Sequence, residues 1–257
     1  MAETREPLIL AIETATRAGS ISVSRGEKIL SSLSGDPVAS HSTDLLDNIC
    51  ELLQTVDAKL GDVTVFAAAS GPGSFTGLRI GLATIKAFAI CLDRKCVGVP
   101  TLAAVAHAAG PSERTVALLP AGRGELYAQS FRVDGNETIE LLDHASHLSP
   151  FDVLAKYGAH RSLKWAGEGA RLHESLLREY AGKHGISFVE DRGGPDAHRF
   201  PIWTLAPMSA QLAESVAALA WREYRDGRAI TATELRAAYV RASDAEIKEK
   251  WRRREHR

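Results

Sequence analysis

Hydrophobic and polar positions in the first 35 residues follow the two-residue period of β-strands. Residues 8–15 form an apolar run, and residues 19–23 and 28–33 alternate between apolar and polar side chains. Short polar turns separate the three segments. The pattern therefore predicts an antiparallel meander of three strands at the start of the fold.

The period changes to that of an α-helix from residue 45 onward. Ser42, Thr43 and Asp44 precede this helix, and their side-chain oxygens can cap it. Its apolar stripe covers roughly 160° of the helix surface, whereas a helix on one sheet needs only about 100°. Either the sheet and a neighbouring helix cover the stripe, or part of it is covered by another chain. The stripe consists of Leu45, Leu46, Ile49, Cys50, Leu52, Leu53, Val56 and Leu60.

A second helix is predicted over residues 75–92, after a buried strand at residues 63–69 and a glycine-rich loop. Its apolar side chains point in nearly all directions, and only Arg79, Lys86 and Asp93 form a narrow polar stripe. A helix that is apolar almost all round must be covered on almost all sides. The first helix and nearby loops provide that cover, or a partner chain does.

The rest of the chain repeats this order of elements, with a second half that starts near Arg114. It includes a helix at residues 172–180, a loop at 192–207, an amphipathic helix from 208 to about 225, and a last strand at 237–241. The pattern predicts a two-lobed α/β fold in which each lobe is a mixed sheet flanked by helices. We expect an N-terminal lobe (1–106), a C-terminal lobe (107–206) and a final segment (207–257) that packs back between the lobes.

Composition narrows the class of protein. The 257 residues are 45% hydrophobic and 25% charged with a formal net charge of −1, so a globular core is expected and a global basic field for nucleic acid is not. Cys50, Cys91 and Cys96 lie in apolar segments without a C-x-x-C pair, which favours a reducing compartment. Neither a signal-peptide pattern nor a membrane-spanning run is present, so we expect a cytoplasmic protein without a membrane partner.

Two segments are candidates for chemistry. The loop from Gly71 to Gly77, with Gly73 and Ser74, precedes a helix and can bind an anion there, although it matches neither the P-loop nor the dinucleotide pattern. The alternative interpretations of this loop are a tight turn that lets the helix pack closely, and a site of specific protein contact. Glu13 and Thr14 end the first strand, where a carboxylate can hold a magnesium nucleotide or can be an ordinary turn residue.

Several motifs, taken together, resemble the TsaB (YeaZ) family of bacterial threonylcarbamoyladenosine biosynthesis subunits. The most specific is Gly71-Pro72-Gly73-Ser74-Phe75-Thr76-Gly77-Leu78-Arg79-Ile80-Gly81. The others lie in order along the chain at residues 9–14, 40–42, 97–102, 123–127, 167–170, 239–241 and 243–246. The resemblance implies the actin/hexokinase-like ATPase fold. It also implies a role in modifying the adenosine 3′ of the anticodon in tRNAs that read codons beginning with A.

In that family TsaB is the non-catalytic partner of TsaD, which carries ATP and a metal ion, and TsaE joins them. The resemblance implies that the first two helices bind TsaD, or a second TsaB when the protein is alone, and that tRNA is contacted indirectly through the complex. The expected interface residues are Leu45, Leu46, Ile49, Leu53, Phe75, Leu78, Arg79, Leu82 and Lys86.

The chain differs from the catalytic members of the wider fold at positions where those members have strand-end Asp residues or metal-binding histidines. Those members place an Asp at the end of the first strand of each lobe, where this chain has Glu13 and Pro120. TsaD has metal-binding histidines after the strand that corresponds to residues 97–99, and here the first histidine is His107. We therefore expect no catalytic residues, no metal and no cofactor of its own.

Two rival functions remain at this stage. One is an enzyme of the same fold, an ATP-dependent small-molecule kinase or a hydrolase. The other is an RNA-binding module that acts through the tail at residues 248–257, where Trp251 precedes three arginines, Arg252 to Arg254. A frayed, solvated terminus is the alternative for that tail.

Overall fold

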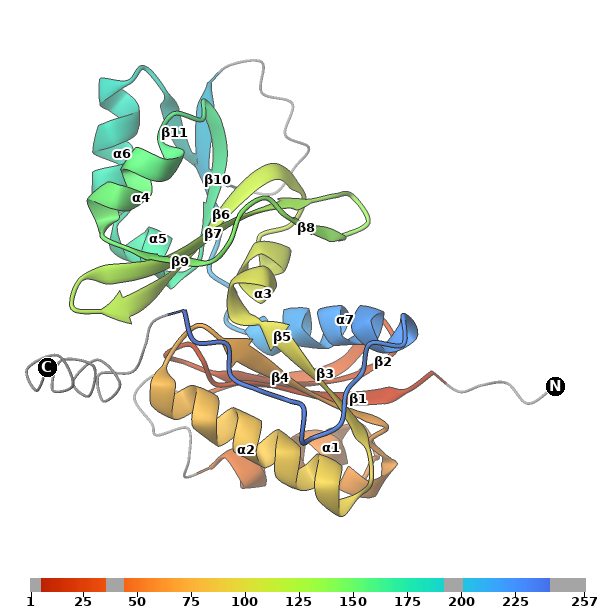
Figure 1. Cartoon of the computed structure of the whole chain (residues 1–257). Helices are drawn as coiled ribbons and strands as arrows, with labels where there is room; N and C mark the ends of the chain where they lie inside the picture. Colours follow the sequence, from red (N-terminus) through yellow and green to blue (C-terminus); the bar gives the residue numbers. More distant parts are fainter. Residues whose placement is uncertain (1–5, 36–43, 192–200, 241–257) are drawn as a thin grey trace, which may run out of the picture.

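The computed structural model describes residues 6–35, 44–191 and 201–240 and contains two lobes, each built on a β-sheet (Figure 1). The predicted capping residues Ser42 and Thr43, and the tail from Arg241 onward, lie outside these ranges. Within the described ranges, no helix has the length and apolar character required to cross a lipid bilayer.

The N-terminal lobe contains a five-stranded sheet of order β3-β2-β1-β4-β5. The first three strands pair antiparallel, as the meander predicts, and β4 and β5 continue the sheet parallel to β1. The elements are β1 (Leu8–Glu13), β2 (Ser20–Arg25), β3 (Lys28–Ser34), α1 (Leu45–Thr55), a 3₁₀ turn (Leu60–Asp62), β4 (Val65–Gly71), α2 (Phe75–Cys91), β5 (Lys95–Pro100) and α3 (Thr101–Ala108).

The C-terminal lobe repeats that strand order. Its sheet runs β8-β7-β6-β10-β12-β11, with antiparallel pairs among β6, β7 and β8 and parallel pairs from β6 through β10 to β12. The predicted architectural repeat is therefore confirmed. The elements are β6 (Ser112–Gly122), β7 (Glu125–Val133), β8 (Ile139–Leu141), β9 (Ser146–Leu148), α4 (Pro150–Tyr157), β10 (Ser162–Ala166), α5 (Glu168–Leu172), α6 (Glu174–Lys183), β11 (Ser187–Glu190), β12 (Ile202–Leu205) and α7 (Leu212–Arg225).

Alternation along the central strands divides the hydrophobic core into layers. On β1, Leu8, Leu10 and Ile12 face α1 and α2, whereas Ile9 and Ala11 belong to the core around α3 and α7. This is why β1 reads as a continuous apolar run: both of its faces are covered. A third cluster lies between the C-terminal sheet and helices α4 and α6. The layers thus run α1/α2, sheet, α3/α7, sheet, α4–α6 (Figure 1).

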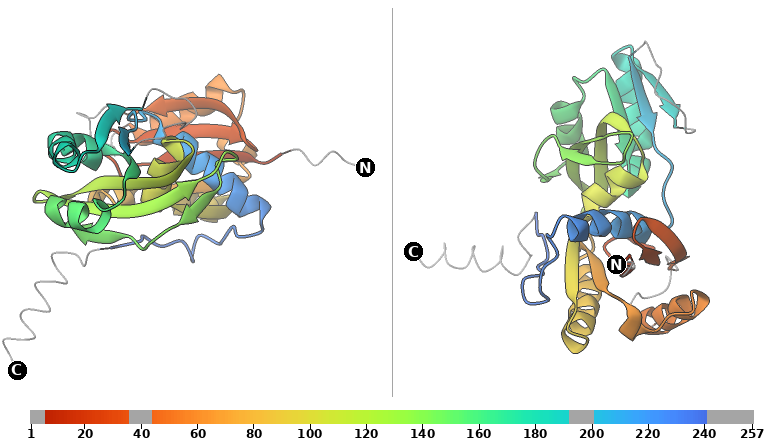
Figure 2. Two further views of the ribbon diagram at one scale, coloured as in Figure 1. Left: turned by 90° about the horizontal axis from the view of Figure 1, so that it is seen from above. Right: turned by 90° about the vertical axis from the view of Figure 1, so that its right-hand side faces the viewer.

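The two lobes exchange their last helices. α3 follows the last strand of the N-terminal sheet and packs on β6 and β7, while α7 follows the C-terminal sheet and packs on β1 and β2. Figure 2 shows α7 between the lobes. His107 of α3 lies 3.0 Å from the Ser215 hydroxyl of α7 through Nδ1, and Ser20 of β2 accepts the Ala213 N–H at 2.9 Å. The middle layer therefore joins both sheets into one unit.

The mispredicted elements are concentrated toward the C-terminus. The predicted loop at 192–207 contains β12, which lies between β10 and β11. The predicted strand at 237–241 is irregular over its described residues, 237–240, and only the Ala238 N–H bonds to the sheet, at Ser70 O. The helix predicted at 172–180 is α6, which begins two residues later at Glu174, because Leu172 ends the separate short helix α5. The predicted start of the long helix at Met208 is also wrong, because α7 begins at Leu212.

Candidate partner-binding surface and interlobe cleft

Helices α1 and α2 cover the outer face of the N-terminal sheet, and this corrects part of the predicted interface. Five of its residues have 8% or less of their surface exposed because they face the sheet; they are Leu45, Ile49, Leu53, Leu78 and Leu82. They cannot contact a partner in this conformation. Leu46, Phe75 and Arg79 are exposed, and Lys86 is half-buried.

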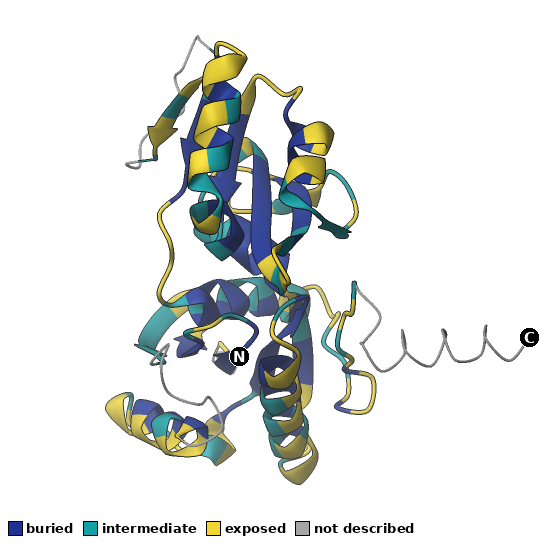
Figure 3. Cartoon of the chain, turned by 90° about the vertical axis from the view of Figure 1, so that its left-hand side faces the viewer, coloured by how far each residue is buried: buried dark blue, intermediate teal, exposed yellow. Residues whose placement is uncertain are grey.

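The face of α2 opposite the sheet is bare and mostly apolar. Its exposed residues recur every three or four positions, which places them on one side of the helix. We call this surface the α2 flank: Phe75, Thr76, Arg79, Ala83, Ala87, Ile90 and Cys91. Ile90 is 64% exposed, and Figure 3 shows the exposed stripe along the helix. Ala83, Ala87, Ile90 and Cys91 were not predicted, although their spacing from Phe75 places them opposite Leu78, Leu82 and Ile85.

The neighbouring helix α1 adds an apolar edge. Leu46 is 57% exposed, and Cys50, one turn later, is also exposed. Both belong to the wide part of the predicted stripe, so the described residues leave that part exposed. Of the three cysteines, Cys50 and Cys91 are exposed and Cys96 is buried. Asp44 precedes α1 but makes no side-chain cap.

The few polar groups of this surface are not paired with acids. Among the described residues, no ion pair involves α1 or α2, whereas α4 to α6 form several. The Arg79 guanidinium lies 3.8 Å from the centre of the Phe75 ring. The Tyr239 ring lies beside Phe75 with a centroid separation of 5.8 Å. This exposed Arg, Phe and Tyr group has the composition typical of interface anchors.

The glycine-rich loop between β4 and α2 packs closely on the end of β1. A Cβ atom on Gly77 would lie 1.8 Å from the Thr14 carbonyl oxygen, and one on Gly73 would lie 2.5 Å from that of Ala15. The Thr14 hydroxyl donates to Gly77 O at 2.7 Å, and the Ser74 hydroxyl accepts the Gly77 N–H as the helix cap. These contacts give the glycines a packing role, and anion binding at this loop stays a hypothesis.

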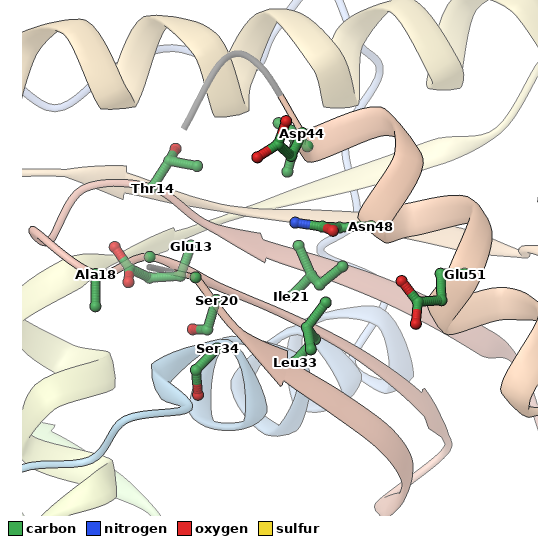
Figure 4. Close-up of a pocket in the computed structure, with 13 residues that line it drawn as sticks. Glu13, Thr14, Ala18, Ser20, Ile21, Leu33, Ser34, Asp44, Asn48 and Glu51 are labelled. Atoms are coloured by element: carbon green, nitrogen blue, oxygen red, sulfur yellow. The ribbon is translucent and has the colours of Figure 1, made fainter. Parts of the chain in front are cut away.

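Glu13 lies at the end of β1 with 1% of its surface exposed. Burial raises the pKa of this carboxyl above its ordinary value, although hydrogen bonds from the hydroxyl (2.6 Å) and the N–H (2.7 Å) of Thr16 partly oppose the shift. The carboxyl borders two cavities. One of about 300 Å³ is also lined by Asp44, Asn48 and Glu51 of the α1 side (Figure 4).

The second cavity is the cleft between the lobes, of about 200 Å³. Glu13 and Glu168 contribute carboxylates to it, and the remaining lining is largely apolar, as with Val105, Leu119 and Met208. Within the residues that the structure describes, no three His, Cys, Asp or Glu side chains are grouped to hold a metal ion. The volume of this cleft is below the range of about 300 to 1,000 Å³ that is usual for ligand pockets.

Comparisons with known proteins agree with this geometry. Residues 37–189 match the family model described as TsaD, tRNA N6-adenosine threonylcarbamoyltransferase. The Escherichia coli tRNA threonylcarbamoyladenosine biosynthesis protein TsaB is 32% identical over 131 residues, which cover 50% of this chain and 56% of that protein. The Bacillus subtilis protein of the same name is 24% identical over 187 residues, covering 69% of this chain and 78% of that protein. The match therefore spans about half the length of the Escherichia coli relative.

The solved structure of YeaZ from Pseudomonas aeruginosa superimposes with a TM-score of 0.69 at 24% identity, over 91% of this chain and 99% of that one. The doubled sheet order and the exchanged helices define the actin/hexokinase-like class of fold. The chain belongs to the family that the matching model describes and, within it, to the TsaB/YeaZ group.

Proposed function

We propose that this chain is a partner-binding subunit in the threonylcarbamoylation of tRNA and contributes no active site of its own. The observation that carries the proposal is the α2 flank with Leu46. It is an apolar surface on the outside of a lobe whose own core is already closed. Exposed apolar surface of this kind marks interaction sites in soluble proteins. The proposed process, threonylcarbamoyladenosine biosynthesis on tRNA, is the one that the names of the relatives give.

The partner on this surface is a TsaD-type subunit, which holds the ATP and the metal ion and performs the transfer. TsaE joins the complex, and a second copy of this chain covers the surface when the partner is absent. The modified nucleoside is the adenosine 3′ of the anticodon in tRNAs that read codons beginning with A. The motif resemblance supports these assignments, as does the match of residues 37–189 to the TsaD family model.

The energetics of such an interface depend on a few anchors. A stable contact buries about 800 Å² on each partner, and a small central group of residues dominates its energy. Covering the exposed parts of Leu46 and Ile90 contributes about 1 kcal/mol each from burial alone. Placing a carboxylate at either position removes that gain and buries an unpaired charge.

The rival function, an ATP-dependent kinase or hydrolase, has less support. It requires a site for phosphates and magnesium between the lobes. By the motif resemblance, the Asp that catalytic members place at the end of each lobe's first strand is replaced here by Glu13 and Pro120, and the cleft measures only about 200 Å³. We therefore assign no reaction step to this chain.

The proposal is tested by co-purification with the TsaD-type protein of the same organism. The double variant Leu46→Glu with Ile90→Glu should lose the partner while it keeps the circular dichroism spectrum and melting temperature of the parent. The matched control is Phe151→Glu with Leu172→Glu, because these side chains are at least as exposed as Leu46 and Ile90 but lie on the C-terminal lobe. Retention of the partner by the first variant, or its loss in both, would contradict the assignment of the surface.

A further inference from the structure

Two cations of α2, Arg79 and Lys86, lie between the large apolar residues of the α2 flank. At 100° per residue, Arg79 and Lys86 project about 40° and about 20° from Phe75 around the helix axis, and Ile90 projects about 60° from it. Arg79 is exposed and Lys86 is half-buried. A partner that covers both Phe75 and Ile90 therefore also covers the two cations.

Within the described ranges, no carboxylate neutralises these two cations. The 17 residues of α2 include no Asp or Glu, and neither cation forms an ion pair with another part of the described chain. Asp93 follows the end of the helix and is not paired with them either. Ion pairing is common elsewhere on the surface, since Arg178 and Lys183 of α6 each contact a glutamate. The missing counter-charge is therefore a property of the α2 surface.

Contacts with aromatic rings hold the Arg79 side chain in place. Its guanidinium lies 3.8 Å from the centre of the Phe75 ring, and the Tyr239 ring lies 5.8 Å from that ring. The backbone beside Tyr239 is fixed to the sheet, because the Ala238 N–H donates to Ser70 O at 2.7 Å. A guanidinium stacked on a ring keeps the N–H groups in its own plane free to bind a carboxylate at two points. The stack therefore presents Arg79 as a preorganised donor.

We propose that Arg79 and Lys86 recognise a helix of the partner subunit that carries two carboxylates about 10 Å apart. The inference rests on the proposed function, which places a protein partner on the α2 flank. Covering an unpaired cation with apolar surface is unfavourable, so a stable interface supplies an acid opposite each one. The spacing follows from the seven residues, or two helical turns, that separate the cations.

The surroundings of the cations favour an acidic helix over the phosphates of RNA. Ala83, Ala87 and Ile90 lie beside them on the α2 flank. Nucleic-acid interfaces are polar and strongly positive, whereas apolar side chains with a few charged groups are typical of protein interfaces. A second copy of this chain would offer the exposed Asp47 and Glu51 of α1, so the experiment separates it from the partner subunit.

The first measurement is the affinity for the TsaD-type protein over a range of salt concentrations. The parent affinity should fall as salt rises, because salt screens the two charge pairs. Arg79→Gln with Lys86→Gln should lower the affinity about tenfold at low salt and make the remainder nearly independent of salt. The circular dichroism spectrum and melting temperature should stay those of the parent, since both side chains lie outside the core.

Two control variants accompany this measurement. Arg79→Lys with Lys86→Arg keeps both charges and should retain the salt dependence of the parent. Arg178→Gln with Lys183→Gln neutralises one Arg and one Lys on α6 of the C-terminal lobe, and should leave both the affinity and its salt dependence unchanged.

A zero-length cross-link identifies the group that lies opposite Lys86. A carbodiimide joins a lysine amine to a neighbouring carboxyl group as an amide and takes up the water that is released. Mass spectrometry of the treated complex should find Lys86 joined to an Asp or Glu of the partner subunit. Lys86→Arg keeps the charge and the affinity but has no amine to couple, so this cross-link should disappear.

The outcomes separate this proposal from the proposed function. Unchanged affinity and salt dependence in the Arg79→Gln, Lys86→Gln variant, with the parent complex intact, overturns this proposal alone. A cross-link from Lys86 to a second copy overturns it too, as does a loss of self-association or of tRNA binding in that variant while partner affinity is kept. If the parent chain forms no complex with the TsaD-type protein, this proposal and the proposed function both fail.

Discussion

The two lobes share one sheet order but differ in the helices that cover their outer faces. In the C-terminal lobe, α6 carries ion pairs along its surface, such as Arg178 to Glu174 at 2.7 Å and Lys183 to Glu179 at 2.6 Å. Phe151 and Leu172 are exposed there, one on α4 and one on α5. In the N-terminal lobe the corresponding layer presents Leu46 and the continuous α2 flank, and its described residues form no ion pair.

The comparison separates what the fold requires from what function adds. Each sheet needs helices that are apolar on the side that faces it, and both outer layers meet that need. The fold does not require a second apolar face on α2, because in the equivalent layer of the C-terminal lobe the exposed side of α6 is charged. The additional apolar face of the N-terminal lobe is therefore the part of the structure that we attribute to partner binding.

The largest expected effect distinguishes the two faces of α2. Leu82 faces the sheet with 6% exposure, so Leu82→Glu buries a charge and should cost about 4 kcal/mol in the free energy of unfolding. Ile90→Glu on the flank should change that energy by no more than about 0.5 kcal/mol. Urea unfolding measures both. Similar losses for the two variants would mean that the flank is structural.

A smaller effect concerns Glu13, the buried carboxyl at the end of β1. Because the folded-state pKa of Glu13 is raised, its stabilising contribution is present below pH 4.5 and is lost as pH rises through the folded pKa. As pH rises above 4.5, the parent should therefore lose stability relative to Glu13→Gln, as measured by urea unfolding at each pH.

Asp143 of the C-terminal lobe provides a control of opposite sign. Burial would raise the pKa of Asp143, but hydrogen bonds from Lys156, the Ser130 N–H and Tyr157 outweigh it and lower the pKa. The parent should lose stability relative to Asp143→Asn only as pH falls toward and below 3.8. A parallel pH dependence for the two carboxyls would contradict these environments.

The smallest effect is expected on the charged surface of α6. Arg178→Gln removes an exposed ion pair with Glu174 and should lower the free energy of unfolding by about 0.3 to 0.5 kcal/mol, less at high salt. Partner affinity should not change. If partner affinity fell in this variant, the interface would include the C-terminal lobe, and its assignment to α1 and α2 would be contradicted.

Periodicity predicted most of the fold because most elements are local patterns. The meander, α2 and the repeat of the two lobes follow directly from residues 8–33, 75–92 and the second half of the chain. β12 was missed because Ile202–Leu205 is a short run between Pro201 and Pro207, and its position is set by pairing with β10 and β11. The apolar residues at 237–240 were read as a strand, although only Ala238 bonds to the sheet.

The candidate surface was predicted less well than the fold. An excess of apolar residues on α1 and α2 can be read from the sequence, and the structure confirms a bare apolar flank. Which residues form it depends on how each helix is rotated against the sheet. That rotation buries Leu53 and Leu78 and exposes Ile90, and it is fixed by tertiary packing rather than by the local pattern.

Hydrogen–deuterium exchange of the chain with and without its TsaD-type partner tests the central claim most directly. Peptides from α1 (Leu45–Thr55) and from the second half of α2 should gain protection in the complex, while those from α4 and α6 should exchange as they do in the free chain. Protection that appears on α4 and α6 but not on α1 and α2 would contradict the account.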